Sequence, residues 1–244
     1  MQCVILAGGR ASRLRPLTQS VPKSLVPIKG HAFIHYQLTW LHRQGVTRII
    51  LCIGLMGDQI RQYVGDGSRW GMKVNFVDEG EDLLGTGGAI RLAFKQGVLA
   101  EKFLVIYGDS FLPINFRRVM NAFTSQPLPA LMTVYRNEGR WNSSNVWYEN
   151  NLVRIYDKYG QKPELAHRLD YIDYGLSAFS RTLVEDQFPE RTKFDLSQFY
   201  FDLSQSQGLA GLEVPTRFYE IGSMEGIKDF TRWLERSDIT TYRG

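Results

Sequence analysis

The sequence has few cysteines and no long apolar run. Only two cysteines, Cys3 and Cys52, occur among its 244 residues, and both lie in strand-like stretches. We expect both to be buried reduced thiols, and no spacing of cysteines predicts a metal site. No stretch approaches the roughly 18 consecutive apolar residues of a membrane helix. No basic and then apolar leader opens the sequence, so we expect a cytoplasmic protein with no membrane partner.

The sequence also lacks a strong excess of one charge. Its formal net charge is +4, and the lysines and arginines are scattered among the acids. A nucleic-acid-binding protein usually has a concentrated basic face, so nucleic acid is disfavoured as a partner, whereas anionic small substrates suit this charge. No linker, repeat or low-complexity stretch divides the chain. Its 43% apolar and 22% charged residues are typical of one sizeable globular domain.

What is present begins with a strand that runs into a cationic loop. Residues 3–7 are apolar and rich in β-branched side chains, which predicts a buried strand. Gly8 and Gly9 follow it and would let a phosphate approach the backbone N–H groups. Four cations come next, namely Arg10, Arg13, Arg15 and Lys23. This pattern favours a polyphosphate site, although two adjacent glycines alone also fit an ordinary turn with solvated arginines.

Strands and helices alternate over the first half of the chain. Strands are predicted at residues 48–53, 73–77 and 103–107, and helices at 32–44, 58–64 and 87–97. This alternation predicts an α/β fold with a mostly parallel sheet and helices on both faces. Ligands of such sheets bind at the carboxyl ends of the strands, where Gly8, Glu79 and Asp109 fall. A carboxylate placed like Asp109 either holds Mg²⁺ or caps the next turn.

The second half is rich in short strands with tight turns. Strands are predicted at residues 130–136, 146–148, 152–156, 171–179 and 209–214, and helices at 194–207 and 224–236. We therefore expect a single domain over residues 1–236. Its parts would be a first half (1–128), a β-rich half (129–223) and a C-terminal helix (224–236).

The opening loop is part of a longer motif. It reads Leu6-Ala7-Gly8-Gly9-Arg10-Ala11-Ser12-Arg13-Leu14-Arg15-Pro16-Leu17-Thr18, then Pro22-Lys23-Ser24-Leu25-Val26-Pro27. This motif resembles the opening of the sugar-1-phosphate nucleotidylyltransferases, and the resemblance continues in order over nearly the whole chain. It looks most like the branch of the heptose or mannose 1-phosphate guanylyltransferases, with the heptose enzymes nearest, and it is also similar to the muramate uridylyltransferase branch. The resemblance implies a Rossmann-like three-layer sandwich with a mixed, mostly parallel central sheet. The first half would bind the nucleotide, and a small β-rich lobe would bind the sugar.

The resemblance also implies a nucleotide site made of two segments. Residues 83–89 match a family segment that contacts the nucleobase and ribose, with Leu83 in the place of a proline. The four acids before this segment suit base amino groups or ribose hydroxyls better than phosphates. The candidate nucleotide-binding residues are Leu6, Ala7, Gly8, Gly9, Arg10, Glu79, Gly85, Thr86, Gly87 and Gly88.

Three further sets of residues follow from the resemblance. Arg13 and Lys23 would be catalytic, because they would stabilise charge on the triphosphate and on the transition state. Asp109 and Glu220 would hold Mg²⁺, with Glu220 in the place of the family's aspartate. The sugar phosphate would contact Lys158, Asp173, Tyr174 and Gly175. Asp173 stands where an asparagine is common.

The expected function is transfer of a nucleotidyl group from an NTP, with GTP favoured, to a sugar 1-phosphate. The products would be pyrophosphate and an NDP-sugar for glycan or cell-surface polysaccharide synthesis. A relative that uses UTP, dTTP or CTP stays open, and so do a nucleotide-sensing module of the same fold and assembly into a homo-oligomer. A dinucleotide oxidoreductase is disfavoured because the sequence lacks the Gly-x-Gly-x-x-Gly pattern after its first strand.

Overall fold

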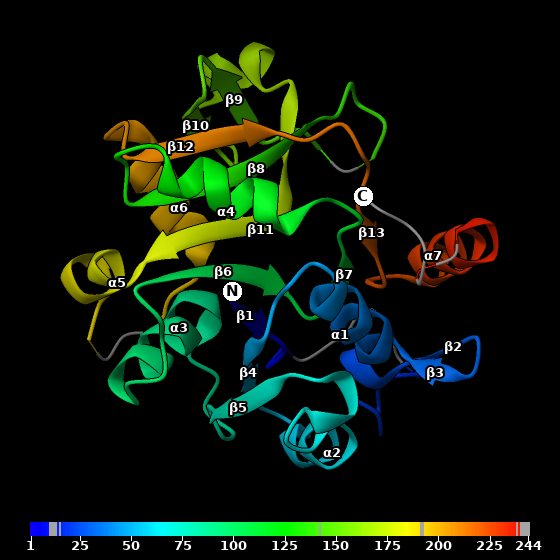
Figure 1. Ribbon diagram of the computed structural model, residues 1–244. Coiled ribbons are helices and arrows are strands. Elements are labelled where there is room, and N and C mark those ends of the chain that lie inside the picture. The colour runs from blue at the N-terminus through cyan, green and yellow to red at the C-terminus, as the bar shows by residue number, and fades with distance from the viewer. Residues whose placement is uncertain (10–13, 15, 142, 191–192, 238, 240–244) are drawn as a thin grey trace.

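A nine-stranded sheet forms the centre of the molecule (Figure 1). The computed structural model describes residues 1–9, 14, 16–141, 143–190, 193–237 and 239. The strand order is β5 (Lys73–Asp78), β4 (Arg48–Ile53), β1 (Gln2–Leu6), β6 (Lys102–Tyr107), β11 (Tyr171–Ser180), β8 (Ala130–Arg136), β12 (Leu209–Glu213), β10 (Leu152–Tyr156) and β9 (Val146–Glu149). Of these nine strands, β11 and β10 run opposite to the others. The sheet is therefore mixed and mostly parallel, as predicted.

Helices cover both faces of the sheet. One face is covered by α1 (Phe33–Arg43), α2 (Gly57–Val64), α4 (Phe116–Thr124) and α7 (Met224–Arg236), and the other by α3 (Gly85–Lys95), α5 (Arg181–Gln187) and α6 (Leu196–Gln205). Strand side chains alternate between the two cores: Cys3 and Ile5 pack in the first, and Val4 packs in the second. Both cysteines are buried and free, as expected. The predicted three-layer α/β class is confirmed.

Two short strand pairs and several 3-10 helices lie outside the central sheet. Strand β7 (Ser110–Phe111) pairs with β13 (Tyr219–Glu220), and β2 (Pro27–Ile28) pairs with β3 (His31–Ala32). The 3-10 helices of the described residues include η2 (Lys23–Leu25), η3 (Ser68–Trp70) and η4 (Pro163–Arg168). The β7–β13 ladder fastens the segment before α7 to the end of β6, so that residues about 110 positions apart become neighbours.

The parallel strands end together at one edge of the sheet. Leu6 pairs with Cys52 on one side and with Tyr107 on the other, and Ile53 pairs with Asp78. The segments that follow β1 and β6 lie close together at Ala7 and Gly108, because residue 108 has no side chain. A Cβ on Gly108 would lie 3.0 Å from the Cα of Ala7. The loops after β1, β5 and β6 therefore converge at this edge.

The strands of the second half extend the same sheet, with β9 and β10 at the end opposite β5 (Figure 1). The predicted strands at 48–53, 130–136 and 152–156 and the predicted helix at 224–236 are confirmed. The structure adds α4 and α5, which begin after the N-caps Asn115 and Ser180. The division of the chain at residues 128 and 223 stays a prediction. None of the described helices has the length and apolar character needed to cross a bilayer.

Candidate active site

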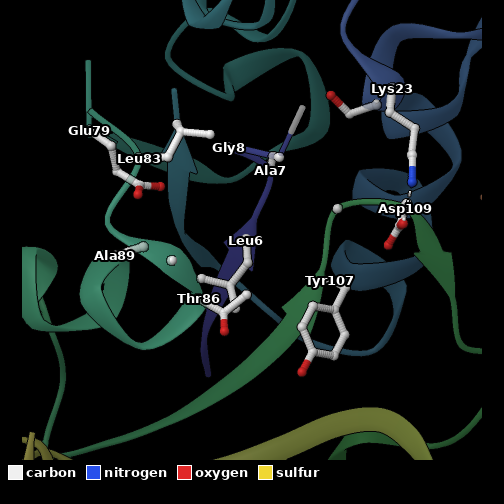
Figure 2. A pocket seen from close by; sticks show the side chains of 14 residues that line it. Leu6, Ala7, Gly8, Lys23, Glu79, Leu83, Thr86, Ala89, Tyr107 and Asp109 are labelled. Carbon is white, nitrogen blue, oxygen red and sulfur yellow. Dashed lines mark hydrogen bonds and ion pairs between the residues drawn. The ribbon is translucent and has the colours of Figure 1, made fainter. Parts of the chain in front are cut away.

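A cavity of about 220 Å³ opens at the carboxyl ends of the parallel strands (Figure 2). It is lined by Leu6, Ala7, Gly8, Gly9, Lys23, Ser24, Glu79, Leu83, Gly85, Thr86, Ala89, Tyr107, Gly108 and Asp109. Most of the residues predicted to bind the nucleotide therefore meet at one place, together with Lys23 and Asp109. The predicted residues Arg10 and Arg13 lie outside the described part of the chain.

Glu79 occupies one side of the cavity (Figure 2). Its Oε2 accepts a hydrogen bond of 2.7 Å from the backbone N–H of Leu84. A Cβ on Gly8 would lie 2.6 Å from Oε1 of Glu79, so glycine is required for this approach. Burial raises the pKa of Glu79, and the hydrogen bond from Leu84 opposes that rise. The carboxylate is thus anchored by one oxygen.

The glycines at the start of α3 have two different roles. Gly85, with φ of +78°, lines the cavity together with Thr86. Gly87 and Gly88 do not line it; their N–H groups donate to the carbonyl oxygen of Phe194, at 3.1 and 3.4 Å. A Cβ on Gly87 would lie 2.2 Å from the ring of Phe194. The contacts of Gly87 and Gly88 are therefore packing contacts, and a nucleotide-binding role for them stays a prediction.

An ion pair occupies the opposite side of the cavity, where Lys23 and Asp109 face each other (Figure 2). The Nζ of Lys23 donates to Oδ2 of Asp109 at 2.8 Å, and the side chains are 16% and 31% exposed. Asp109 follows β6, and Lys23 opens the short helix η2 after Pro22. The predicted catalytic lysine and the predicted metal ligand are therefore in direct contact.

Ser24 is a cavity residue that was not among the predicted site residues. Its Oγ is buried and has no hydrogen-bond partner among the described residues. A buried hydroxyl without a partner is costly, unless a ligand supplies the missing hydrogen bond. The serine stands inside the Pro22–Pro27 motif, but a serine in a short helix carries no signal of its own in the sequence.

Glu220 lies next to Asp109 in the backbone but does not line the cavity. In the β7–β13 ladder Glu220 pairs with Ser110, and the N–H of Ile221 donates to the carbonyl oxygen of Asp109 at 2.9 Å. The side chain of Glu220 is exposed. Among the described residues, no group of three or more His, Cys, Asp or Glu side chains forms a metal cluster. Within the cavity lining, Asp109 and Glu79 are the carboxylates.

Tyr107 lines this cavity and also lies close to a second group of polar side chains. The pKa of Tyr107 lies well above its usual value, mainly because the ring is buried and partly because of Tyr200 and Asp173 nearby. The Nζ of Lys158 donates to Oγ of Ser197 at 3.2 Å. Burial raises the pKa of Asp173 to about 6, although the Gly175 N–H and Lys158 oppose the rise. Lys158 and Asp173, two of the predicted sugar-phosphate residues, thus lie in one cluster.

The other two predicted sugar-phosphate residues are backbone and core positions. Gly175 has φ of +95°, and a Cβ there would lie 3.7 Å from the Tyr107 ring. Tyr174 is 1% exposed, stacks edge-to-face on Phe218 with ring centroids 5.7 Å apart, and donates its hydroxyl to the Arg217 carbonyl at 3.4 Å. The side chain of Tyr174 belongs to the first core. Helix α6 and Val134 pack in the second core, on the opposite face of the sheet. The predicted contact between Tyr174 and the sugar phosphate gains no support from this position.

Asp195 is a further member of the cluster that was not among the predicted site residues. It is the N-cap of α6 and accepts a hydrogen bond of 2.8 Å from the N–H of Ser197. Burial alone would raise the pKa of Asp195, but hydrogen bonds from Ser197, the charge of Lys158 and the Thr86 hydroxyl hold it below its usual value. In the sequence, its spacing to Lys158 gives no sign of this proximity, because strand β11 and helix α5 intervene.

Comparison with known proteins agrees with this geometry. A family model described as nucleotidyl transferase matches residues 2–191. The chain is 34% identical over 125 residues to the D-glycero-alpha-D-manno-heptose 1-phosphate guanylyltransferase of Aneurinibacillus thermoaerophilus, which is 51% of this chain and 53% of that protein. It is 35% identical over 127 residues to the N-acetylmuramate alpha-1-phosphate uridylyltransferase of Neisseria meningitidis serogroup B, which is 52% and 54% of the two chains. Each of these alignments spans about half the length of the relative.

Solved structures extend the similarity to the whole chain. HddC from Yersinia pseudotuberculosis has a TM-score of 0.76 at 27% identity, over 96% of this chain and 99% of that one. A putative glucose-1-phosphate thymidylyltransferase from Bacillus anthracis has a TM-score of 0.82 at 19% identity, over 98% and 96% of the chains, and supports the fold alone. The cavity at the strand ends and the Lys23–Asp109 pair fit this similarity. Because the family model matches residues 2–191, this chain belongs to the nucleotidyl transferase family.

Proposed function

We propose that the protein transfers a nucleotidyl group from a nucleoside triphosphate to a sugar 1-phosphate and releases pyrophosphate. The observation that carries this proposal is the pairing of Lys23 with Asp109 on the wall of a cavity that also exposes Gly8 and Gly9. A cation, a carboxylate and a glycine-rich strand end are what a triphosphate with its metal requires. The unpartnered hydroxyl of Ser24 in the same wall supplies a free donor for a phosphate oxygen.

The chemistry needs placement more than proton transfer. An oxygen of the sugar phosphate attacks the α-phosphorus of the triphosphate, and the bond between the α-phosphorus and the bridging oxygen breaks, so that pyrophosphate leaves. The phosphate dianion is already a nucleophile and needs no general base. Lys23 would stabilise the negative charge that grows on the transferred phosphoryl group. Arg13 is proposed to act with it, from the same cationic loop.

The residues present fit a bound Mg²⁺ near Asp109. The ion takes oxygen ligands and commonly combines one or two carboxylates with substrate phosphates. Asp109 offers such oxygens at the cavity, and its Oδ1 is otherwise contacted by the Ser110 hydroxyl at 3.4 Å. When bound, Mg²⁺ would neutralise charge on the phosphates. We propose Asp109 as the principal ligand and Glu220, from the adjacent strand, as the second.

We propose GTP as the nucleotide, and the position of Glu79 supports this choice. Oε2 of Glu79 is occupied by the Leu84 N–H, whereas Oε1 is directed toward Gly8. A carboxylate accepts hydrogen bonds only, and the Watson–Crick edge of guanine offers adjacent N–H donors, whereas uracil and thymine place one N–H between two carbonyl oxygens. We therefore propose that Glu79 reads guanine. Relatives named as guanylyltransferases for heptose and mannose 1-phosphates accord with this choice.

The direct test is pyrophosphate release from each NTP in the presence of Mg²⁺ and a panel of sugar 1-phosphates. We expect release with GTP and at least one acceptor, and formation of the matching GDP-sugar by mass spectrometry. Lys23→Ala should lower the rate by roughly 100- to 1,000-fold with an unchanged circular dichroism spectrum. Lys228→Ala, an exposed lysine on α7, serves as the matched control and should behave as wild type. Full turnover by Lys23→Ala would refute the proposed role of this lysine.

A nucleotide-sensing module is the alternative, because a protein that binds NTP without turnover would need the same cavity. The two functions differ in one readout. A sensing module would raise its melting temperature with NTP and Mg²⁺ yet release no pyrophosphate with any acceptor. We further propose a cytoplasmic location, and we leave assembly into a homo-oligomer as an expectation to be tested by light scattering.

A further inference from the structure

A buried glutamine on α1 contacts the short segment that carries Asp109. Gln37 is 2% exposed, and its Nε2 donates to the carbonyl oxygens of Tyr107 and Ser110, at 2.9 and 2.7 Å. These two carbonyls lie at the end of β6 and at the start of β7, on either side of Gly108 and Asp109. The side chain of Gln37 therefore bridges the backbone around the carboxylate that is proposed to bind the metal.

This bridge requires the nitrogen of an amide. Both partners are carbonyl oxygens, which only accept hydrogen bonds, so the NH₂ group of Gln37 must face them. Its Oε1 is then buried without a hydrogen-bond partner among the described residues. An unpartnered buried oxygen lowers the stability of a fold. Side chains that break such a local rule are characteristic of functional positions.

Other elements hold the same segment from different directions. The N–H of Gly108 donates to the carbonyl oxygen of Leu6 in β1, and the N–H of Ile221, after β13, donates to the carbonyl oxygen of Asp109, both at 2.9 Å. Gln37 adds the attachment from α1. Attachments to three separate elements fix the orientation of the peptide groups around Asp109, and hence the direction of its side chain.

Helix α1, which lies beside β7 (Figure 1), also holds the other member of the ion pair. The N–H of Phe33, at its first turn, donates to the carbonyl oxygen of Val26 at 3.0 Å. The N–H of Val26 in turn donates to the carbonyl oxygen of Lys23 at 3.1 Å. One helix therefore sets the position of the Lys23 backbone relative to that of Asp109.

We propose that Gln37 is a positioning residue for Asp109, whose amide holds the segment between β6 and β7 so that the carboxylate faces both Lys23 and the bound metal. This inference rests on the proposed function, since it concerns the metal site of the same reaction. Gln37 is not part of the cavity lining, so it acts through Asp109. Without the amide, the charges of the site are unchanged, but the peptide groups around Asp109 are free to rotate. The metal then binds more weakly.

The test removes the amide and keeps the shape of the side chain. Gln37→Met has an unbranched side chain of similar length and no N–H donor. Mn²⁺, which accepts the same oxygen ligands as Mg²⁺, is titrated into the full-length protein and measured by electron paramagnetic resonance. The titration is made in the presence of a non-hydrolysable analogue of the NTP that binds the wild type most tightly.

The expected result is a loss that is specific to the metal. Mn²⁺ should bind Gln37→Met at least about tenfold more weakly than the wild type, whereas binding of the analogue without metal should change by less than about twofold. A smaller loss of Mn²⁺ affinity in the folded variant would overturn the proposal. A wild-type protein that binds no Mn²⁺ would overturn it as well.

Trp40→Phe is the matched control, because it removes a hydrogen bond of the same kind between the same helix and the same segment. The Nε1 of Trp40, a residue that is 1% exposed, donates to the carbonyl oxygen of Leu112 at 2.9 Å, beyond Asp109 in the chain. Both variants should lower the melting temperature, but only Gln37→Met should weaken the binding of Mn²⁺. Equal losses of Mn²⁺ affinity would show that Gln37 merely packs α1 against the segment, and would overturn its positioning role.

A double variant tests whether Gln37 acts through Asp109. In an Asp109→Asn background, Gln37→Met should cause no further loss of Mn²⁺ affinity, because the carboxylate that it positions is gone. A full further loss in that background would overturn the proposal.

Binding of Mn²⁺ is measured without turnover, so the proposed function can fail separately. A wild-type protein that binds Mn²⁺ in the expected Gln37-dependent way but releases no pyrophosphate would refute only the transfer reaction. A protein that releases pyrophosphate, and whose Gln37→Met variant keeps the Mn²⁺ affinity of the wild type, would refute only the positioning role.

Discussion

We propose a nucleotide end and an acceptor end for the site, and the two ends hold their carboxylates in different ways. Asp109, at the nucleotide end, has the Nζ of Lys23 at 2.8 Å and is 31% exposed. Asp173, at the acceptor end, is partly buried, shares the charge of Lys158 with Asp195, and has a pKa raised to about 6. The charge of Asp109 is neutralised by Lys23 without any ligand. The charge of Asp173, in contrast, lowers the stability of the fold. Groups that lower stability and yet are kept are characteristic of binding sites.

The ends also differ in how the chain builds them. The nucleotide end comes from loops that follow neighbouring parallel strands, so its parts are brought together by the regular βαβ pattern. The acceptor end combines the turn after β10, an irregular stretch of β11 and the N-terminus of α6. Its geometry depends on the packing of the second core, and mutations there should change substrate choice before they change chemistry.

The largest expected contrast comes from Asp109→Asn, the same chemical change that tests Asp173. Loss of this carboxylate should lower the rate of pyrophosphate release by roughly 1,000-fold, since charge on the phosphates is no longer neutralised. Stability should fall by no more than about 1 kcal/mol, because the ion pair with Lys23 is partly exposed. Stopped assays and urea denaturation measure the two effects. Retention of more than a tenth of the activity would contradict the assignment of Asp109.

Asp173→Asn should produce the opposite result for stability. Folding raises the pKa of Asp173 from 3.8 to about 6, so the folded state favours the protonated acid. The charged form therefore destabilises the fold, with no cost below pH 3.8 and the full cost above about pH 6. The asparagine variant should gain up to roughly 3 kcal/mol at pH 7.5.

The pH dependence supplies the control for that gain. Urea denaturation at pH 7.5, 6 and 4.5 should show the advantage of Asp173→Asn shrinking as the pH falls, since wild-type Asp173 becomes protonated in the folded state. An equal or growing advantage at pH 4.5 would mean that the side chain, and not its charge, limits stability. Asp202→Asn should show no such trend, because Asp202 is exposed.

The sequence predicts which strand ends meet at the cavity, but it does not predict the contacts around Lys158, for a physical reason. Strand ends such as Gly8, Glu79 and Asp109 can be located from apolar runs, and parallel strands must bring them together. Ser24 and Asp195 carry no comparable signal, because their roles depend on tertiary packing that brings α6 and η2 to the cavity. Tyr174 shows the same limit, since only the pleat of β11 decides which face its ring occupies.

Gly87→Ala tests whether Gly87, near the start of α3, is needed for packing against Phe194 or for binding the nucleotide. The added methyl group would lie 2.2 Å from the ring of Phe194, so we expect a loss of about 2 kcal/mol in the free energy of unfolding. Replacing Phe194 by leucine in the same protein should restore part of that loss by opening space. Thermal denaturation of the two single variants and the double variant measures this coupling. A Gly87→Ala protein of normal stability that no longer binds NTP would favour the nucleotide-binding role.

The smallest expected effect concerns the choice of base. In Glu79→Gln the amide oxygen can keep the hydrogen bond from the Leu84 N–H, which leaves the NH₂ group facing the base in place of Oε1. Guanine would then meet a donor with its own donors, whereas a uracil carbonyl would meet a partner. We expect GTP to bind roughly tenfold more weakly and UTP to bind as well or better, in competition titrations. Glu81→Gln changes an exposed acid of the same segment and should preserve the preference for GTP. If Glu79→Gln weakened every NTP equally, Glu79 would shape the cavity wall, and the choice of base would have to come from the backbone of Gly85 and its neighbours.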